Sequence, residues 1–355
     1  MTTRRPTPAI ENDTEPGAKP RRRGRRPSRR ILLITGSVLV ALVATPVIVN
    51  EITPRPYVSV FRALIGQVDS AVQLGPYEPD VASVTVSDLI DVPVDGAPDA
   101  GITFYTDGNS TDAPKPVILL MHGGGWVVGS ASQIGEYAEL LASQGFLVAN
   151  LTYSLAPEQA HPTQLQQSAA ALDYLHEHAT ERGGNGSQLF VAGNSAGAQL
   201  AGQLAAVVTN PDLARTTGVQ PTTTRDDLKG VILYSGPYDF DTVEQTSFPG
   251  FWAYAWSYTG KKDWQEYDRL DELSVTRGAS DNFPPTYMTA GDADPLEPQT
   301  YELDAVLRSR GVDVTSRYWT GSGLNLPHDY IYDLRTDAAR TAFADTVDFV
   351  MRHVD

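Results

Sequence analysis

Short apolar runs alternate with segments of helical spacing along most of this chain. The runs at 116–121 and 146–153 are apolar almost throughout, which is typical of parallel strands covered on both faces. Further strands are predicted at 188–192, 231–234, 286–290 and 312–319, and helices at 164–178, 196–208, 301–310 and 338–352. This alternation begins near residue 81 and predicts an α/β fold, with a mostly parallel central sheet and helices on both faces.

The first 80 residues do not follow this pattern. Residues 1–30 are rich in proline and arginine and have almost no apolar side chains, so we expect a disordered basic tail. Residues 31–49 carry no charge, and about 20 apolar residues are enough to span a bilayer. Residues 50–80 contain four prolines, and we expect them to form a linker or part of a cap.

The apolar segment at 31–49 admits three interpretations. We favour a single-pass signal anchor, because the segment is long and no small-residue cleavage site follows it. The arginines before it place the N-terminus inside and the chain after Asn50 outside the cell membrane. One alternative is a secreted protein with a cleaved signal peptide, since residues 28–32 resemble a twin-arginine signal. The other is a buried core helix, which leaves the arginines unexplained.

Charge and composition exclude several kinds of site. The whole chain has a net charge of -16, but the 17 basic and 40 acidic side chains after residue 30 leave that part at -23. Such an acidic body repels nucleic acid and anionic lipid, so we expect neither as a ligand. The absence of cysteine excludes disulfides, thiolate metal sites and a cysteine nucleophile.

An aromatic segment at 248–267 interrupts the strand–helix alternation. It holds three of the five tryptophans of the chain. Its aromatic residues include Phe251, Trp252, Tyr254, Trp256, Tyr258 and Trp264. The segment is either a satellite aromatic core or a small cap over a pocket, since inserted segments often shape a binding site.

Ser195 lies in the sequence GNSAG at 193–197, between a predicted strand and a predicted helix. A serine nucleophile in such a motif occupies a strained strand-to-helix turn that only small neighbours permit. The N-terminus of the following helix favours developing negative charge. The motif alone is weak evidence, but its context is the required one, and we predict Ser195 as a nucleophile.

The sequence HGGGW at 122–126 directly follows the strand predicted at 116–121. Acyl transfer requires N–H donors about 3 Å from the oxyanion, and consecutive glycines let the backbone turn its N–H groups toward a substrate. A tight glycine turn is the alternative, but the position upstream of Ser195 favours an oxyanion loop. Trp126 in this segment and Asn194 beside the serine are the expected substrate contacts.

A general base and an acid are expected after Ser195, in the order acid and then histidine. His328 and His353 are the two histidines that follow, and His353 lies near the end of the last predicted helix. His328 follows the last predicted strand and a loop, so we predict it as the base. Asp292 and Asp294 compete for the acid, whose carboxylate orients the imidazole and stabilises its charged form.

Five ordered blocks resemble the hormone-sensitive lipase-like branch of the α/β-hydrolases, the HGGG carboxylesterases. They are HGGGW at 122–126, YSLAPE at 153–158, GNSAG at 193–197, DPL at 294–296 and His328, and the resemblance covers about residues 81–355. It implies an α/β-hydrolase fold and Asp294 as the acid. It also implies an oxyanion hole formed by the N–H groups of Gly124, Gly125 and Ala196.

The chain departs from the pattern of this family at three places. Asn194 replaces the usual Asp or His before the serine, and Ala198-Gln199 replaces the usual Gly-Asn. The usual His-Gly-Phe is His328-Asp329-Tyr330 here. These changes leave every predicted triad member in place and bear on substrate preference.

The sequence thus predicts a serine hydrolase that cleaves small, short-chain carboxylic esters through an acyl-enzyme, without a metal or organic cofactor. An amidase, a peptidase or a carbohydrate deacetylase could use the same residues. A non-catalytic ligand-binding relative is a third hypothesis, less favoured because all three triad residues are present.

Overall fold

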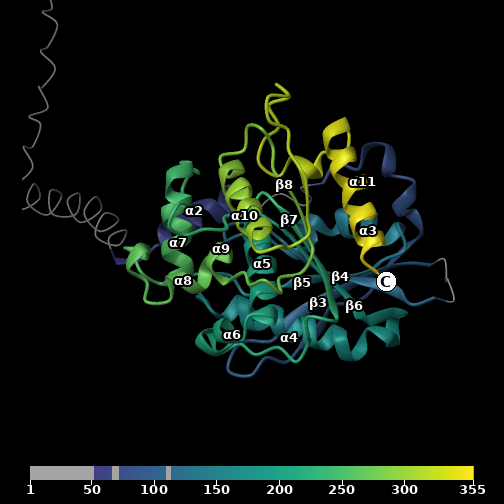
Figure 1. Ribbon diagram of the computed structural model, residues 1–355, viewed down its shortest axis with the longest axis horizontal. Helices are drawn as coiled ribbons and strands as arrows, with labels where there is room; N and C mark the ends of the chain where they lie inside the picture. Colours follow the sequence, from purple (N-terminus) through teal and green to yellow (C-terminus); the bar gives the residue numbers. More distant parts are fainter. Residues whose placement is uncertain (1–51, 66–71, 109–112, 355) are drawn as a thin grey trace, which may run out of the picture. The chain divides into compact units, whose positions relative to one another are not determined.

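The computed structural model describes residues 52–65, 72–108 and 113–354 (Figure 1). The predicted basic tail at 1–30 and the predicted membrane segment at 31–49 lie outside these residues. No helix within the described ranges is long and apolar enough to cross a membrane. Membrane anchorage and a location outside the cell membrane therefore stay predictions.

Among the described residues, nine strands form one sheet with the order β1-β3-β5-β4-β6-β7-β8-β9, and β2 pairs with β3. The strands are β1 (Val84–Val86), β2 (Ile90–Val92), β3 (Ala100–Asp107), β4 (Lys115–Met121), β5 (Leu147–Thr152), β6 (Gly184–Asn194), β7 (Leu228–Tyr234), β8 (Thr286–Thr289) and β9 (Val314–Arg317). All pairs from β5 to β9 are parallel, and β3 pairs antiparallel with β1, β2 and β5. The predicted mostly parallel sheet is confirmed, whereas the three antiparallel strands were not predicted.

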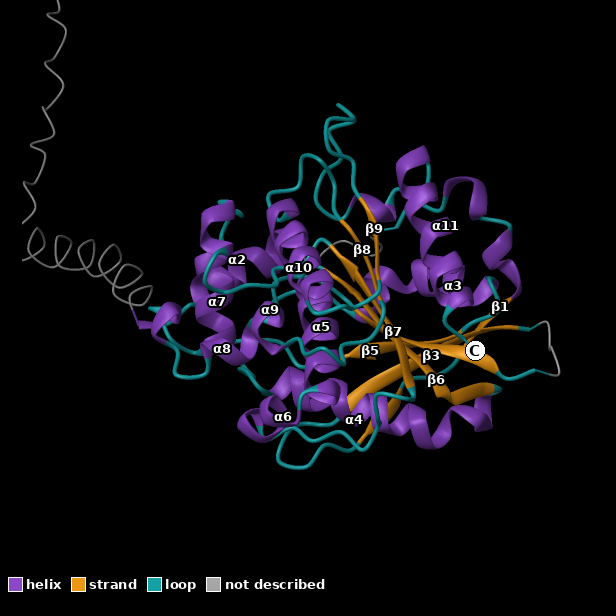
Figure 2. Ribbon diagram, in the orientation of Figure 1, coloured by secondary structure: helices purple, strands orange, loops and turns teal. Residues whose placement is uncertain are grey.

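Helices cover both faces of this sheet, as predicted (Figures 1 and 2). They are α2 (Arg55–Ile65), α3 (Gly135–Ser143), α4 (Thr163–His178), α5 (Ala196–Thr209), α6 (Pro211–Thr217), α7 (Phe251–Thr259), α8 (Leu270–Leu273), α9 (Val275–Gly278), α10 (Glu297–Ser309) and α11 (Asp337–Arg352). Helices α3 and α11 share one hydrophobic core with the sheet, and α4, α5 and α10 share the other.

Strand β4 shows why its sequence is apolar throughout. Val117, Leu119 and Met121 belong to the core shared with α4 and α5. Ile118 and Leu120 belong to the core shared with α3 and α11. All five side chains are fully buried. Because successive side chains of a strand point to opposite faces, a strand between two helical layers needs apolar residues at every position.

The aromatic segment at 248–267 contains α7, which packs against α2. Tyr57 of α2 meets Trp252 edge to face with ring centroids 4.6 Å apart, and Phe61 meets Tyr254 at 4.9 Å. Most aromatic side chains of the segment are buried, whereas Trp252 is 44% exposed. The segment is thus an aromatic core, and it also lines the cavity described below. Residues 55–65 of the predicted linker or cap form α2.

Candidate active site

Loops after β4, β6 and β8 meet at the carboxyl edge of the sheet. Ser195 ends the turn from β6 to α5 with φ 52° and ψ −120°, a strained conformation for a residue with a side chain. A Cβ on Gly193 would lie 2.4 Å from the backbone of Gly197, and one on Gly197 would lie 2.1 Å from the carbonyl oxygen of Met121. The turn therefore requires both glycines of the GNSAG motif.

Ser195, His328 and Asp294 form a continuous chain of hydrogen bonds. Ser195 Oγ lies 3.0 Å from His328 Nε2, and His328 Nδ1 lies 3.0 Å from each carboxylate oxygen of Asp294. The Asp294 side chain is fully buried, and it also accepts the backbone N–H of Leu296. With Nδ1–H donating to the carboxylate, Nε2 is left to accept the serine proton.

Asp292, the competing acid, has a different set of partners. Its carboxylate accepts the N–H of Leu326 at 2.7 Å and the hydroxyl of Ser322 at 2.9 Å. Both partners belong to the loop that precedes His328. The structure therefore brings Asp294 to the imidazole, and Asp292 ties down the loop that carries it.

The loop at 122–126, called the HGGG loop from here on, contains two glycines whose conformation and surroundings leave no room for a side chain. Gly124 has φ +109°, and a Cβ there would lie 2.0 Å from the carbonyl oxygen of Val128. Gly125 has φ +59°, and a Cβ there would lie 2.7 Å from the ring of Tyr254. Among the described residues, the backbone N–H groups of Gly124, Gly125 and Ala196 donate no backbone hydrogen bond in the turns and loops.

The YSLAPE block at 153–158 supports the HGGG loop, a role that its sequence did not reveal. The Tyr153 ring stacks on the His122 ring with centroids 4.2 Å apart, and its hydroxyl donates to the His122 carbonyl at 2.7 Å. The N–H of Ala156 donates to the carbonyl of Trp126 at 2.8 Å. Glu158 pairs with Arg62 of α2 at 2.7 Å. The block therefore joins α2 to the HGGG loop.

Trp126 and Asn194, the predicted substrate contacts, use their polar groups within the protein. The Trp126 indole is fully buried, stacks on Tyr258 at 4.4 Å and donates its N–H to Gln199 at 3.1 Å. Asn194 accepts the N–H of Gly123 at 2.9 Å and donates to Asp329 at 2.9 Å. Both residues line the cavity, and a contact of either with substrate stays a prediction.

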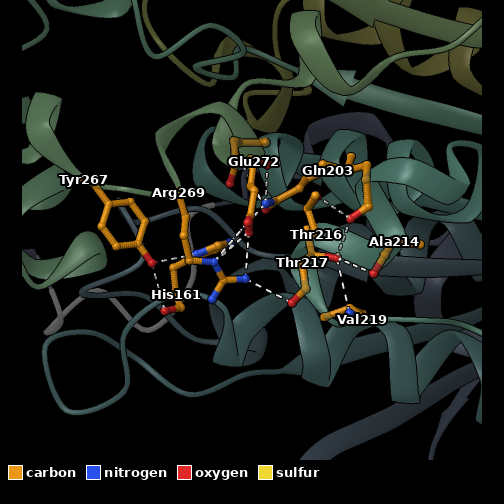
Figure 3. A network of polar contacts seen from close by, with 11 residues as sticks. His161, Gln203, Ala214, Thr216, Thr217, Val219, Tyr267, Arg269 and Glu272 are labelled. Atoms are coloured by element: carbon orange, nitrogen blue, oxygen red, sulfur yellow. Dashed lines mark hydrogen bonds and ion pairs between the residues drawn. The ribbon is translucent and has the colours of Figure 1, made fainter.

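Gln199 begins a network of neutral side chains. Its members Gln203, His161 and Tyr267 appear in Figure 3 beside the Arg269–Glu272 ion pair. Gln199 donates to Gln203 at 3.1 Å, and Gln203 donates to His161 Nε2 at 3.2 Å. His161 Nδ1 lies 3.1 Å from the Tyr267 hydroxyl, which Figure 3 shows beside it. Glutamine at position 199 thus has a structural explanation, because it joins α5 to the HGGG loop through Trp126.

A cavity of about 400 Å³ opens over Ser195. Its lining includes the HGGG loop, Ala196, His328, Asp329 and the largely apolar side chains of Ile134, Phe248, Phe251, Tyr254, Leu296 and Tyr332. No lysine or arginine lines it in the part of the chain that the structure describes. The described ranges of the chain contain no cluster of three or more His, Asp or Glu side chains that could hold a metal ion.

The imidazoles in this region titrate in opposite directions. Burial by itself lowers the pKa of His328, but the carboxylates of Asp329 and Asp294 outweigh burial and raise that pKa to about 9. Burial lowers the pKa of His122 to about 4, partly offset by its hydrogen bond to the Gly123 carbonyl. A histidine between two carboxylates therefore holds a proton more tightly, and a buried histidine without a carboxylate partner holds one less tightly.

Comparison with known proteins agrees with this architecture. A family model described as the alpha/beta hydrolase fold matches residues 118–330, more than half of the chain. The chain belongs to the α/β-hydrolase family. The resemblance that the sequence motifs indicated is therefore confirmed.

Several esterases are similar to this α/β-hydrolase. A versiconal hemiacetal acetate esterase of Dothistroma septosporum is 28% identical over 235 residues, which are 61% of this chain and 66% of that relative. A carboxylesterase of Mycobacterium tuberculosis is 29% identical, over 56% of this chain and 62% of its own length. The chain thus spans slightly less than two thirds of these relatives. The structure of a bacterial heroin esterase aligns with a TM-score of 0.66 and 27% identity, covering 84% of this chain and 90% of that one.

Proposed function

We propose that this protein is a carboxylic ester hydrolase that uses Ser195 as nucleophile, His328 as general base and Asp294 as the acid. One observation carries the proposal: Ser195 Oγ lies 3.0 Å from His328 Nε2, while His328 Nδ1 lies 3.0 Å from a buried carboxylate. This arrangement suits removal of the serine proton and stabilisation of the imidazolium that results. The esterase relatives support the same class of substrate.

The proposed reaction has two acyl-transfer steps. His328 Nε2 takes the Ser195 proton as Oγ attacks the ester carbonyl, and the imidazolium then gives that proton to the leaving alcohol. Water then gives a proton to His328 as its oxygen attacks the acyl carbonyl, and the imidazolium returns that proton to Ser195 Oγ as the acid is released. Gly124, Gly125 and Ala196 line the cavity together with Ser195, and their N–H groups would hold the oxyanion in both steps. None of these steps requires a metal or an organic cofactor.

We infer small esters with short acyl chains as the substrates. The cavity of about 400 Å³ is lined largely by aromatic and aliphatic side chains. Binding sites for drug-sized ligands usually occupy roughly 300–1,000 Å³, so this one lies near the small end. An acetyl esterase of Salmonella, 27% identical over 52% of this chain, also favours a short acyl group.

A substrate panel tests the proposal. The full chain is assayed with p-nitrophenyl esters of increasing acyl length, with matched anilides and with an acetylated glycan, beside the Ser195→Ala variant. We expect turnover of acetyl and butyryl esters that falls for long acyl chains. Ser195→Ala should lower kcat by several orders of magnitude, roughly the 10⁶-fold seen when a serine nucleophile is removed elsewhere.

Covalent labelling separates a hydrolase from a ligand-binding relative. A fluorophosphonate should label the wild type and leave Ser195→Ala unlabelled, since it reacts with an activated serine. Turnover of anilides or acetylated glycan without turnover of simple esters would assign an amidase or a deacetylase instead. A folded wild type that neither reacts with the probe nor hydrolyses any ester would disprove a catalytic role.

A further inference from the structure

A second carboxylate lies beside the proposed base. Asp329 directly follows His328, and its Oδ2 atom lies 3.7 Å from His328 Nε2, the nitrogen that faces Ser195. The Asp294 carboxylate lies 3.0 Å from the other ring nitrogen, Nδ1. The imidazole is therefore placed between two carboxylates, whereas the proposed chemistry needs only the one at Nδ1.

Asn194 holds the Asp329 carboxylate in this position. Its side-chain amide donates to Asp329 Oδ2 at 2.9 Å, and its carbonyl oxygen accepts the N–H of Gly123 at 2.9 Å. The second carboxylate oxygen, Oδ1, is buried and has no hydrogen-bond partner among the described residues. Asp329 also has φ +59°, a left-handed backbone conformation that favours glycine, asparagine or aspartate. Local geometry alone does not require a carboxylate here.

The other described groups around His328 do not offset the negative charge of the Asp329 carboxylate. Phe248 presents an aromatic ring with its centroid 5.0 Å from that of the imidazole. Burial raises the pKa values of the nearby phenols, so they stay neutral; these are Tyr238, Tyr254 and Tyr332. His122 of the HGGG loop is neutral as well, and no lysine or arginine lines the cavity within the described residues. The two aspartates are thus the charges that face the imidazole.

We propose that Asp329, fixed by Asn194, is a positioning residue that stabilises the protonated form of His328 and confines ester hydrolysis to alkaline solution. This inference rests on the proposed function, in which His328 must be neutral to accept the Ser195 proton. The direction of the His328 pKa, raised to about 9 with Asp329 as the first of its two carboxylate causes, agrees with it. Burial raises the pKa of Asp329 itself, while His328 and the Asn194 amide counteract that rise.

The dependence of kcat/KM on pH tests the proposal. In the wild type, kcat/KM should rise through a limb with its midpoint near pH 9, where His328 loses its proton. Asp329→Asn keeps the shape of the side chain and an oxygen that can accept the hydrogen bond from Asn194, but it removes the negative charge. We expect the midpoint to fall by about one pH unit or more, with the plateau above it changed only a few-fold.

Two further variants serve as a second test and as a control for this result. Asp329→Gly also removes the carboxylate and suits the left-handed backbone, so it should shift the limb in the same direction if Asp329→Asn folds poorly. Asp281→Asn removes one negative charge from a side chain that is 81% exposed, and it should leave the limb where it is. A midpoint that stays at the wild-type value in both Asp329 variants would overturn the proposal.

A second measurement separates this inference from the proposed function. The His328 imidazole signal is followed by NMR during a pH titration and identified by its loss in His328→Gln. It should titrate at lower pH in Asp329→Asn than in the wild type, whether or not an ester is turned over. Absence of Ser195-dependent hydrolysis together with this shift would reject the proposed function alone. Hydrolysis with an unshifted titration would reject only the role of Asp329.

Discussion

His328 and His161 are both largely buried imidazoles, and polar contacts connect each of them to the HGGG loop. His328 lies between two carboxylates, and Asn194 links one of them to Gly123. His161 reaches Trp126 through two glutamine side chains. Yet the pKa of His328 is raised to about 9, whereas burial and the nearby Arg269 lower that of His161 to about 3.

The contrast shows that partners, not burial alone, decide the charge of a histidine in this fold. Amide and phenol groups hydrogen-bond the neutral ring and give its charged form nothing to offset desolvation. Carboxylates supply that compensation. The carboxylate network around His328 can therefore move protons at the cavity, whereas the amide and phenol network around His161 can only hold the HGGG loop in place.

Among the substitutions that test this difference between the two histidines, Asp294→Asn should have the largest effect. The amide cannot stabilise the imidazolium and favours the wrong tautomer at Nδ1, so kcat should fall by about 10⁴-fold. Asp292→Asn is the matched control, because that carboxylate bonds the loop before His328 and not the imidazole itself, and it should change kcat less than tenfold. Steady-state kinetics with one short-chain ester compare the two. A far greater loss in Asp292→Asn would show that the acid has been misassigned.

Acid should destabilise the neutral network. The unfolded pKa of a histidine is about 6.5, and the folded pKa of His161 is about 3, so its contribution is complete above pH 6.5 and is lost as pH falls toward 3. We expect the free energy of unfolding to drop by about 2–3 kcal/mol from this residue between pH 6.5 and 4.5.

Denaturant unfolding at several pH values measures this effect. The slope of stability against pH should be shallower in His161→Gln, because the variant has no proton to take up on unfolding. His178→Gln serves as control, since the His178 side chain is 40% exposed and should leave the slope nearly unchanged. Equal slopes in wild type and His161→Gln would mean that the two networks do not differ as described.

Sequence reasoning recovered the parts of this molecule that repeat a local pattern. The strands at 116–121 and 188–192 and the helix at 196–208 follow from unbroken or periodic apolar residues, because two helical layers bury both faces of the sheet. Ser195 and His328 could be selected by motif and chain order, whereas Asp294 was separated from Asp292 only by the family resemblance; the structure brings all three together.

Contacts between distant segments were beyond that reasoning. Asn194 and Asp329 are 135 residues apart, and each was noticed only as a departure from the family pattern. Their hydrogen bond becomes visible once β6 and the loop after β9 meet. The antiparallel strand β2 was missed because its three residues are too few to show a periodicity of their own. Helix α2 was missed because the prolines in and before it were taken as typical of a linker.

The smallest expected effect tests whether the neutral network that begins at Gln199 takes part in the proposed reaction. Gln199→Leu leaves the Trp126 indole N–H and the Leu273 carbonyl without their partner, at a cost of about 1–3 kcal/mol per buried group. The melting temperature should fall, but Trp126 still stacks on Tyr258, so kcat should drop less than about tenfold. Gln164→Leu is the control, because that buried side chain bonds two carbonyls outside the HGGG loop and should leave kcat unchanged. A loss of kcat in Gln199→Leu as large as that in Asp294→Asn would place the neutral network in the reaction itself and remove the distinction between the two histidines.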